Sequence, residues 1–302
     1  MSNDTLYGAI EAGGTKFVCG VGSAETGSIE TVRIETGTPD VTLDEVAAFF
    51  ADVTARHGPI AALGIASFGP LDLDPTSPRY GTITTTPKPG WQHVDLLGRV
   101  SRALGVPASI DTDVNAAALA EARAGAGVGG RTVAYTTVGT GIGVGVALDG
   151  AIRHAGGHAE AGHLLLRRHR AHAAFAGICP FHGDCLEGLA SGPAIIAAWG
   201  DSFEALPADH PAWAVQADYL GQLCAVLVLT VAPDRIVLGG GVMAQPRLLD
   251  EARVRARHWL GGYVERLATP SAFEALILPP GCREAPGLIG AYLLAADAVR
   301  GG

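Results

Sequence analysis

Four side chains of the types that ligate zinc lie close together in the middle of this chain. Cys179, His182 and Cys185 stand at three-residue steps, and His163 precedes them within the same 23-residue stretch. Zinc takes thiolate sulfur and imidazole nitrogen as tetrahedral ligands, and a site with four protein ligands and no open position is structural. The spacing therefore predicts a structural zinc site formed by His163, Cys179, His182 and Cys185.

A second interpretation of the same segment needs no metal. Buried cysteines behave as small hydrophobic residues, and the histidines would then belong to a histidine-rich surface loop. His169 and His172 are alternatives to His163 as the fourth ligand. The regular spacing favours zinc, because three donors at three-residue steps in a loop can converge without a helix. Two acids flank the ligands, Glu160 in HAEAGH and Glu187 in CLEG, which predicts chemistry beside the metal site.

Glycine-rich turns between apolar segments are candidates for binding phosphate. Such turns expose successive backbone N–H groups, glycine permits close approach, and threonine hydroxyls add donors. Ordinary tight turns are the alternative, but two such turns and a third cluster together favour phosphate. Neither turn matches the Walker or dinucleotide-binding pattern. The residues are Gly13, Gly14, Thr15 and Lys16 in the first turn, Gly139, Thr140 and Gly141 in the second, and Gly239, Gly240 and Gly241 in the third cluster.

An acidic segment ends one apolar stretch and begins a helix expected over 116–123. Within it, Asp111 and Asp113 lie near the expected helix N-terminus. Either carboxylate could simply accept hydrogen bonds from the first-turn N–H groups. This window alone leaves a catalytic and a capping role open.

The positioning elements follow from the pattern of apolar residues. Strands are expected over 7–10 and 17–21, around the first glycine turn, and over 131–138 and 144–148, around the second. The alternation of strands with helices predicts an α/β fold. Further elements are expected as a helix over 42–56, strands over 60–66 and 235–238, and a final helix that ends at 299.

Bulk properties limit the function classes. A chain of 302 residues is long enough to divide into two lobes. A net charge of −9 without a Lys/Arg run argues against nucleic acid as a partner. No apolar stretch approaches the roughly 18 residues of a membrane span, and no basic leader is evident. Five cysteines without a disulfide pattern suit a reducing compartment. We expect a cytoplasmic enzyme with no membrane contact.

Taken together, these segments resemble the sugar kinases of the ROK family, within the superfold that also contains hexokinase, actin and the Hsp70 ATPase domain. The resemblance implies a two-lobed actin/hexokinase-like (ribonuclease H-like) α/β fold with a cleft between the lobes. YGTITTTPKPGW, combined with the Cys-x2-His-x2-Cys spacing, resembles bacterial zinc-containing fructokinases. The segments that carry the family resemblance are GAIEAGGTK, DTDVNAAALAE, TVGTGIGVGV, GHAEAGH, CPFHGDCLEGLASGP and IVLGGGVM.

The resemblance also implies residue roles. Asp113 is then the general base for the attacking sugar hydroxyl, and phosphoryl transfer requires mostly positioning and charge neutralisation from the protein. Glu160, His163 and Glu187 hold sugar hydroxyls, with His163 also a zinc ligand. The zinc orders the loop that bears both acids, whereas ATP arrives with Mg²⁺.

Two positions depart from the family pattern. Most members have Asp where this chain has Glu11 and Asn where it has Thr112. Glu11 can hold a magnesium-bound water through its longer side chain. Thr112 offers one hydroxyl in place of an amide, so a sugar contact is weaker or is made by Lys88 or Thr86. We expect substrate choice to depend on this region.

The sequence thus predicts an ATP-dependent hexose kinase that converts fructose to fructose 6-phosphate. Glucokinase, mannokinase and N-acylmannosamine kinase are alternatives within the same family. A sugar-binding repressor would need a winged helix before the first phosphate turn, and a non-catalytic sugar-binding protein would need a damaged site. By resemblance we expect a homodimer. The expected lobes are 1–115 with the final helix, 287–302, and 116–286 with the zinc loop.

Overall fold

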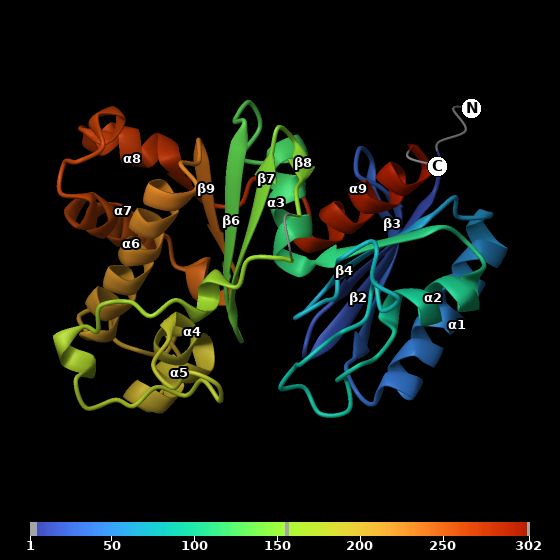
Figure 1. Cartoon of the computed structure of the whole chain (residues 1–302), viewed down its shortest axis with the longest axis horizontal. Coiled ribbons are helices and arrows are strands. Elements are labelled where there is room, and N and C mark those ends of the chain that lie inside the picture. Colours follow the sequence, from blue (N-terminus) through green and yellow to red (C-terminus); the bar gives the residue numbers. More distant parts are fainter. Residues whose placement is uncertain (1–4, 155–156, 301–302) are drawn as a thin grey trace. The chain divides into compact units, whose positions relative to one another are not determined.

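The computed structural model describes residues 5–154 and 157–300 and divides into two compact units (Figure 1). Unit 1 comprises Met1–Gly125, Ala151–His158 and Cys282–Gly302, and unit 2 comprises Ala126–Gly150 and Ala159–Gly281. This division differs from the boundary expected at residue 115. Helix α3 (Asp113–Ala124) stays with unit 1 because it packs against α9 (Pro286–Arg300).

Unit 1 is built on a five-stranded sheet with the order β3-β2-β1-β4-β5. Strands β1 and β2 form the predicted antiparallel hairpin, with Ala12 opposite Phe17 beside the glycine turn. Strand β4 pairs in parallel with both β1 and β5. The strands are β1 (Tyr7–Ala12), β2 (Lys16–Ser23), β3 (Gly27–Glu35), β4 (Leu63–Ser67) and β5 (Ala108–Thr112).

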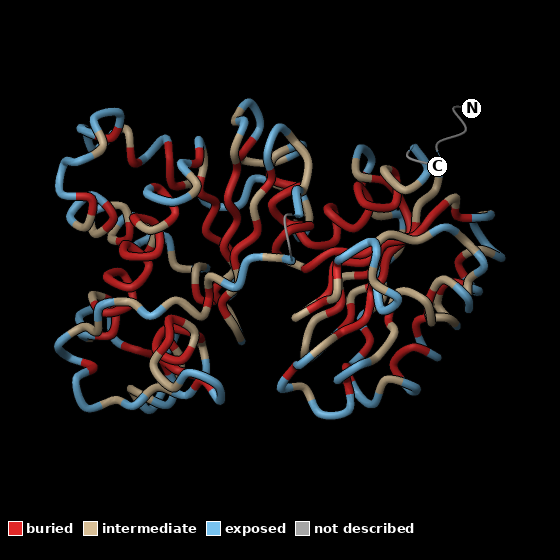
Figure 2. Tube along the Cα trace, in the orientation of Figure 1, coloured by how far each residue is buried: buried red, intermediate tan, exposed pale blue. Residues whose placement is uncertain are grey.

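Helices cover this sheet. Helix α1 (Pro39–His57) buries Val46, Phe50 and Val53, spaced by four and three residues as on one helix face. These side chains belong to the same buried cluster as the strand residues Phe17 and Ile65. Helix α9 is buried over most of its length and packs on β1, β4 and α3 (Figure 2). Helix α2 (Leu96–Leu104) completes the helices of unit 1.

Unit 2 contains a second sheet, whose strands follow the order β10-β9-β6-β7. The predicted second hairpin is present as antiparallel β6 and β7, and β9 pairs in parallel with β6 and with β10. The strands of unit 2 are β6 (Thr132–Val138), β7 (Ile142–Leu148), β9 (Arg235–Gly239) and β10 (Ile277–Leu278). The short strand β8 (Ala151–Ile152) belongs to the segment assigned to unit 1. The helices are α4 (Leu186–Ala190), α5 (Gly192–Trp199), α6 (Ala212–Thr230), α7 (Pro246–Leu260) and α8 (Pro270–Leu276).

Helix α6 corrects one expectation from the sequence. By length and composition it could cross a membrane, with a mean hydropathy of 1.4. The sequence pattern missed it because isolated polar residues interrupt its apolar run. In the fold, 83% of that window is buried, and Trp259 Nε1 donates to buried Asp218. Such burial on nearly all sides is typical of a helix in the core of a large protein.

Candidate active site and metal centre

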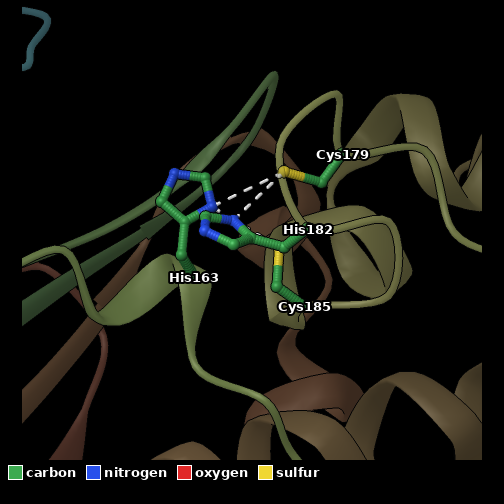
Figure 3. Close-up of side chains that lie close together, drawn as sticks. All are labelled: His163, Cys179, His182 and Cys185. Carbon is green, nitrogen blue, oxygen red and sulfur yellow. Dashed lines mark hydrogen bonds between the residues drawn. The ribbon is translucent and has the colours of Figure 1, made fainter.

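The four predicted zinc ligands converge in unit 2 (Figure 3). His163 Nδ1 lies 3.4 Å from Cys185 Sγ and 3.7 Å from Cys179 Sγ, and His182 Nδ1 lies 3.6 Å from Cys179 Sγ. All four ligand atoms lie within 4.8 Å of one another. Zinc–sulfur bonds of about 2.3 Å and zinc–nitrogen bonds of about 2.0–2.1 Å at tetrahedral angles place sulfur and nitrogen about 3.6 Å apart. The donor spacing therefore fits zinc.

Two close backbone arrangements hold these ligands. Gly162, in the 3₁₀ turn η1 (Ala161–His163), packs so tightly on β7 that a Cβ there would overlap the Ile142 carbonyl oxygen. Cys179 and Gly183 exchange two backbone hydrogen bonds, of 3.1 and 2.9 Å, which close the turn that carries His182. Cys185 then stands at the N-cap of α4. The ligands thus come from two short, backbone-braced turns and one helix start.

Without a cation, the electrostatics of the cluster keep the Cys185 thiol protonated. Burial raises the pKa of the Cys185 thiol to about 11, and neighbouring Cys179 and Glu187 act in the same direction. A coordinating thiol is deprotonated outright by a bound metal ion. Two buried thiols beside two imidazoles, with no open position, form a soft donor set of the kind that structural zinc prefers.

The two alternative histidines lie elsewhere. His169 Nδ1 accepts a hydrogen bond from the Ala171 N–H and caps the turn η2 (Arg170–His172). His172 is only 2% exposed, and its ring lies among those of Phe175, Trp199 and Tyr219. Among the described residues, the group of ligand atoms contains His163 and neither of these alternatives.

Unit 2 should lose stability in acid because His172 is buried. Burial, and then the charges of His169 and Arg168, lower the pKa of His172 from 6.5 to about 4. Between these values the folded form binds fewer protons than the unfolded form, so the free energy of unfolding rises with pH over this window. His172→Gln should reduce that rise by about 1 to 3 kcal/mol. The free energy of unfolding is measured by urea denaturation at several pH values, with tryptophan fluorescence as the signal.

His57 provides the control for this experiment. It is an exposed histidine of α1 and pairs with Glu30 at 3.1 Å. In His57→Gln, the free energy of unfolding should rise between pH 4 and 6.5 as steeply as in the wild type. The zinc ligands are unchanged in all three proteins, so the difference between variants reports His172. An unaltered slope in His172→Gln would contradict the assignment.

The second and third glycine clusters meet in unit 2. Parallel pairing aligns Thr137 of β6 with Gly239 of β9, so both strands end at the same edge of the sheet. Gly240 has a φ of 92°, and a Cβ there would overlap the backbone of Val138. The turn after β6 is closed by a 2.9 Å hydrogen bond from the Gly139 N–H to the Gly141 carbonyl. Two of the three predicted phosphate-binding clusters therefore form one glycine-lined edge.

The two predicted sugar-binding acids occupy different positions in unit 2. Glu187 lies on α4 next to Cys185, and its carboxylate accepts a 3.0 Å hydrogen bond from the Ile142 N–H at the base of the second glycine turn. Glu160 is exposed and stands at the N-cap of η1, two residues before Gly162. The metal loop, the glycine edge and Glu187 are thus connected by direct contacts within one unit.

The first glycine turn lies in unit 1, between β1 and β2. The Gly13 N–H donates to the Lys16 carbonyl at 2.9 Å, and Thr36 Oγ1 donates to the Gly13 carbonyl at 2.8 Å. These bonds fix the turn and leave the Thr15 and Lys16 side chains exposed. Glu11 precedes the turn, and its pKa is raised by burial against the opposing charge of Lys16. A carboxylate that burial destabilises is a suitable partner for a cation.

The predicted catalytic residue is the first residue of α3. Thr112 is the N-cap of this helix, and its Oγ1 accepts a 3.2 Å hydrogen bond from the Asn115 N–H. The cap is therefore neither of the two aspartates considered from the sequence. Asp113 is partly exposed, and its Oδ1 accepts from the adjacent Val114 N–H at 2.9 Å. The N-cap role therefore belongs to Thr112, and Asp113 is not needed to cap the helix.

The predicted sugar-side residues before α2 are held by a buried tryptophan. Trp91 is fully buried, and its Nε1 donates to the Gly37 carbonyl at 2.9 Å. Thr86 is 2% exposed and accepts a 3.3 Å hydrogen bond from the Lys88 N–H. Lys88 itself is partly exposed. The structure thus makes Thr86 a support of this turn, with Lys88 the better placed of the two to meet a ligand.

One constellation was missed by reasoning from the sequence. Asp111 is 3% exposed, and its Oδ2 lies 2.8 Å from His154 Nε2, although 43 residues separate the two. The sequence signal was the two histidines before Glu160, His154 and His158, which the metal-free interpretation placed in a histidine-rich surface loop. Such a distant pair has no characteristic spacing.

The chain matches one family of known proteins along nearly its whole length. The family model described as the ROK family matches residues 7–298. A fructokinase of Zymomonas mobilis is 42% identical to this chain over 302 aligned residues. The alignment covers 99% of each of the two chains.

Two solved structures share the fold. A ROK hexokinase of Thermus thermophilus, 28% identical, superposes with a TM-score of 0.79 over 99% of this chain and 100% of that one. A ROK family glucokinase of Streptomyces griseus, solved with glucose and AMPPNP, is 26% identical with a TM-score of 0.74 over 97% and 99%. From the family match along nearly its whole length, and from the 42% identity to a relative covered to 99%, the chain belongs to the ROK family.

Proposed function

We propose that this chain transfers the γ-phosphoryl group of MgATP to the 6-hydroxyl of a hexose, and that the hexose is fructose. The observation that carries the proposal is the 42% identity, over nearly all of both chains, to a protein named fructokinase. The glucokinase and hexokinase structures of the same family are only 26% and 28% identical.

In this mechanism Asp113 orients the sugar hydroxyl and accepts its proton as the bond to phosphorus forms. Phosphoryl transfer has a loose transition state, so a carboxylate of low basicity at a helix N-terminus can still serve. Glu160, Glu187 and His163 hold other hydroxyls of the sugar, with Thr112 and Lys88 as further contacts. Bidentate carboxylates suit vicinal hydroxyl pairs, because each oxygen can accept from one of them.

The glycine clusters act on the nucleotide in this proposal. Backbone N–H groups of the three clusters, together with Thr15, Thr140 and Lys16, bind the phosphates. Glu11 holds a water of the magnesium ion, which neutralises charge on the transferred group when it is bound. The zinc site holds the turn before α4, so that Glu187 keeps its contact with Ile142.

The sugar preference is tested with an assay that couples ADP release to NADH oxidation. With MgATP and fructose, glucose, mannose or N-acetylmannosamine, kcat/KM should be highest on fructose by at least about tenfold, a difference of about 1.4 kcal/mol in transition-state binding. Preference for another hexose would overturn the fructose assignment and keep the kinase. No turnover on any of the four would overturn the kinase proposal itself.

We also propose a homodimer located in the cytoplasm. Size-exclusion chromatography with light scattering should give twice the chain mass of 30.8 kDa. A mass of one chain at micromolar concentration would exclude the dimer. Recovery of the protein in the membrane fraction would exclude the location.

A further inference from the structure

The carboxylate of Asp111 organises the start of α3. Its Oδ1 accepts a 2.8 Å hydrogen bond from the Thr112 N–H and another of 2.8 Å from Asn115 Nδ2. The Asp111 side chain is 5% exposed and the whole of Asn115 only 6%. One buried carboxylate therefore bonds to residues on both sides of Asp113, the N-cap Thr112 and the first-turn residue Asn115.

A single imidazole occupies the other oxygen of this carboxylate. His154 Nε2 lies 2.8 Å from Asp111 Oδ2, and the His154 side chain is 28% exposed. A hydrogen bond to Asp111 is the largest cause that raises the pKa of His154 above its ordinary value. The two side chains therefore form a charge-assisted hydrogen bond over the pH range in which His154 is protonated.

His154 belongs to a segment that has a second anchor in unit 1. Residues Ala151–His158 cluster with this unit although the chain before and after them belongs to unit 2. Within the segment, His158 Nε2 accepts a 3.0 Å hydrogen bond from the Leu71 N–H. His154 bonds to Asp111, at the junction of β5 and α3. The segment thus contacts the start of α3 through His154, a side chain to which we assign no role in sugar, phosphate or zinc binding.

We propose that Asp111 and His154 are a positioning pair for Asp113. The imidazole fixes the Asp111 carboxylate, and the carboxylate fixes the backbone and side chain on both sides of Asp113. Without the imidazole, the nearly buried carboxylate loses this cationic partner, and protonation or reorientation would disturb its two bonds to Thr112 and Asn115. Displacement of a reacting group by about 1 Å can cost about 10²-fold in rate. The inference rests on the proposed kinase function, because it concerns the placement of the general base.

The experiment compares kcat and KM of the full-length protein and its variants, on fructose or on whichever hexose the wild type prefers. His154→Ala should lower kcat by about 10- to 100-fold, while KM for MgATP stays within about twofold. His154→Gln places an amide nitrogen where Nε2 stands and should recover most of kcat. His57→Ala is the matched control, since His57 also pairs with a carboxylate, Glu30, far along the chain from Asp113, and it should leave kcat unchanged.

The pH profile separates positioning from mere structural support. A raised pKa means that the charged pair is fully present below the ordinary histidine pKa and is lost as pH rises through the raised value. The wild type should therefore show a fall in kcat on the alkaline side that His154→Gln lacks. Tyr80, whose pKa is raised by burial and by the charge of Asp111, ionises above its usual range and stays neutral in this interval. Asp111→Asn should abolish the same fall.

Several outcomes would overturn the inference. One is wild-type kcat and an unaltered pH profile in His154→Ala. Another is a lower thermal midpoint of His154→Ala with no change in kcat, which would make the pair structural only. A third is additivity in the double variant of His154→Ala and Asp111→Asn. If its loss of kcat, as a free energy, equals the sum of the losses of the two single variants, the two side chains act independently. An inactive wild type would instead overturn the proposed kinase function, and this inference with it. An active wild type with an unaffected His154→Ala variant would overturn only the positioning role of Asp111 and His154.

Discussion

Replacing Asp113 with alanine is expected to lower kcat by about 10²- to 10⁴-fold, the usual contribution of a positioned general base. Asp113 begins α3, and its side chain is partly exposed, so its removal leaves the cap made by Thr112 intact. Fructose binding, measured by calorimetry in the absence of ATP, should therefore change little. The expected signature is a fall in kcat and in kcat/KM by similar factors.

Asp74→Ala serves as the control for this variant. Asp74 is an exposed aspartate of unit 1 whose carboxylate accepts hydrogen bonds from the Thr76 N–H and hydroxyl. This change should leave kcat at the wild-type level. Normal turnover with lost sugar binding in Asp113→Ala would show that Asp113 is a binding residue and not the base.

Replacing Cys179 with serine is expected to reduce zinc affinity by at least about 10²-fold, because even the outer partners of metal ligands contribute about 10- to 100-fold. Cys179 is buried, and its Sγ lies 3.6–3.7 Å from two of the other ligand atoms. Loss of the metal should loosen the turn that leads into Glu187. The purified variant should contain well below one zinc per chain by elemental analysis, with faster amide exchange over residues 176–188.

Cys282 offers the matched cysteine control. It is only partly buried and does not belong to the group of ligand atoms. Cys282→Ser should retain full zinc content and slow exchange in the same loop. If Cys179→Ser also kept one zinc per chain, the proposed ligand set would be wrong.

The elements beside the glycine turns could be predicted because their signals are local. Strand, turn and strand follow one another within about 15 residues in each hairpin, and the apolar runs and glycines alone specify that arrangement. The same holds for Cys179, His182 and Cys185, whose three-residue steps already limit how far apart they can lie. The sequence favoured His163 as the fourth ligand but left His169 and His172 as alternatives. The structure distinguishes them through packing, because Gly162 fits closely on β7.

The features that could not be predicted all depend on distant parts of the chain. Helix α3 joins unit 1 because α9, at the other end of the sequence, provides its packing surface. The contact between Glu187 and Ile142 spans 45 residues, and that between Asp111 and His154 spans 43. No periodicity of a single sequence encodes such pairings, because they result from how separate elements meet in three dimensions. The apolar character of α6 was underestimated for a related reason, since its polar residues are paired only in the fold.

The interleaving of the two units has a consequence for how the polypeptide matures. The chain passes between units after Gly125, Gly150, His158 and Gly281, and α9 packs against β1 and β4 from the first part of unit 1. During synthesis, the N-terminal sheet must therefore wait for the last residues to leave the ribosome before one of its faces is covered. Contacts between such distant segments slow folding and leave apolar surface exposed meanwhile. Nascent chains lacking α9 should therefore be preferred clients of chaperones, and neither unit can be produced alone by cutting the gene at one place.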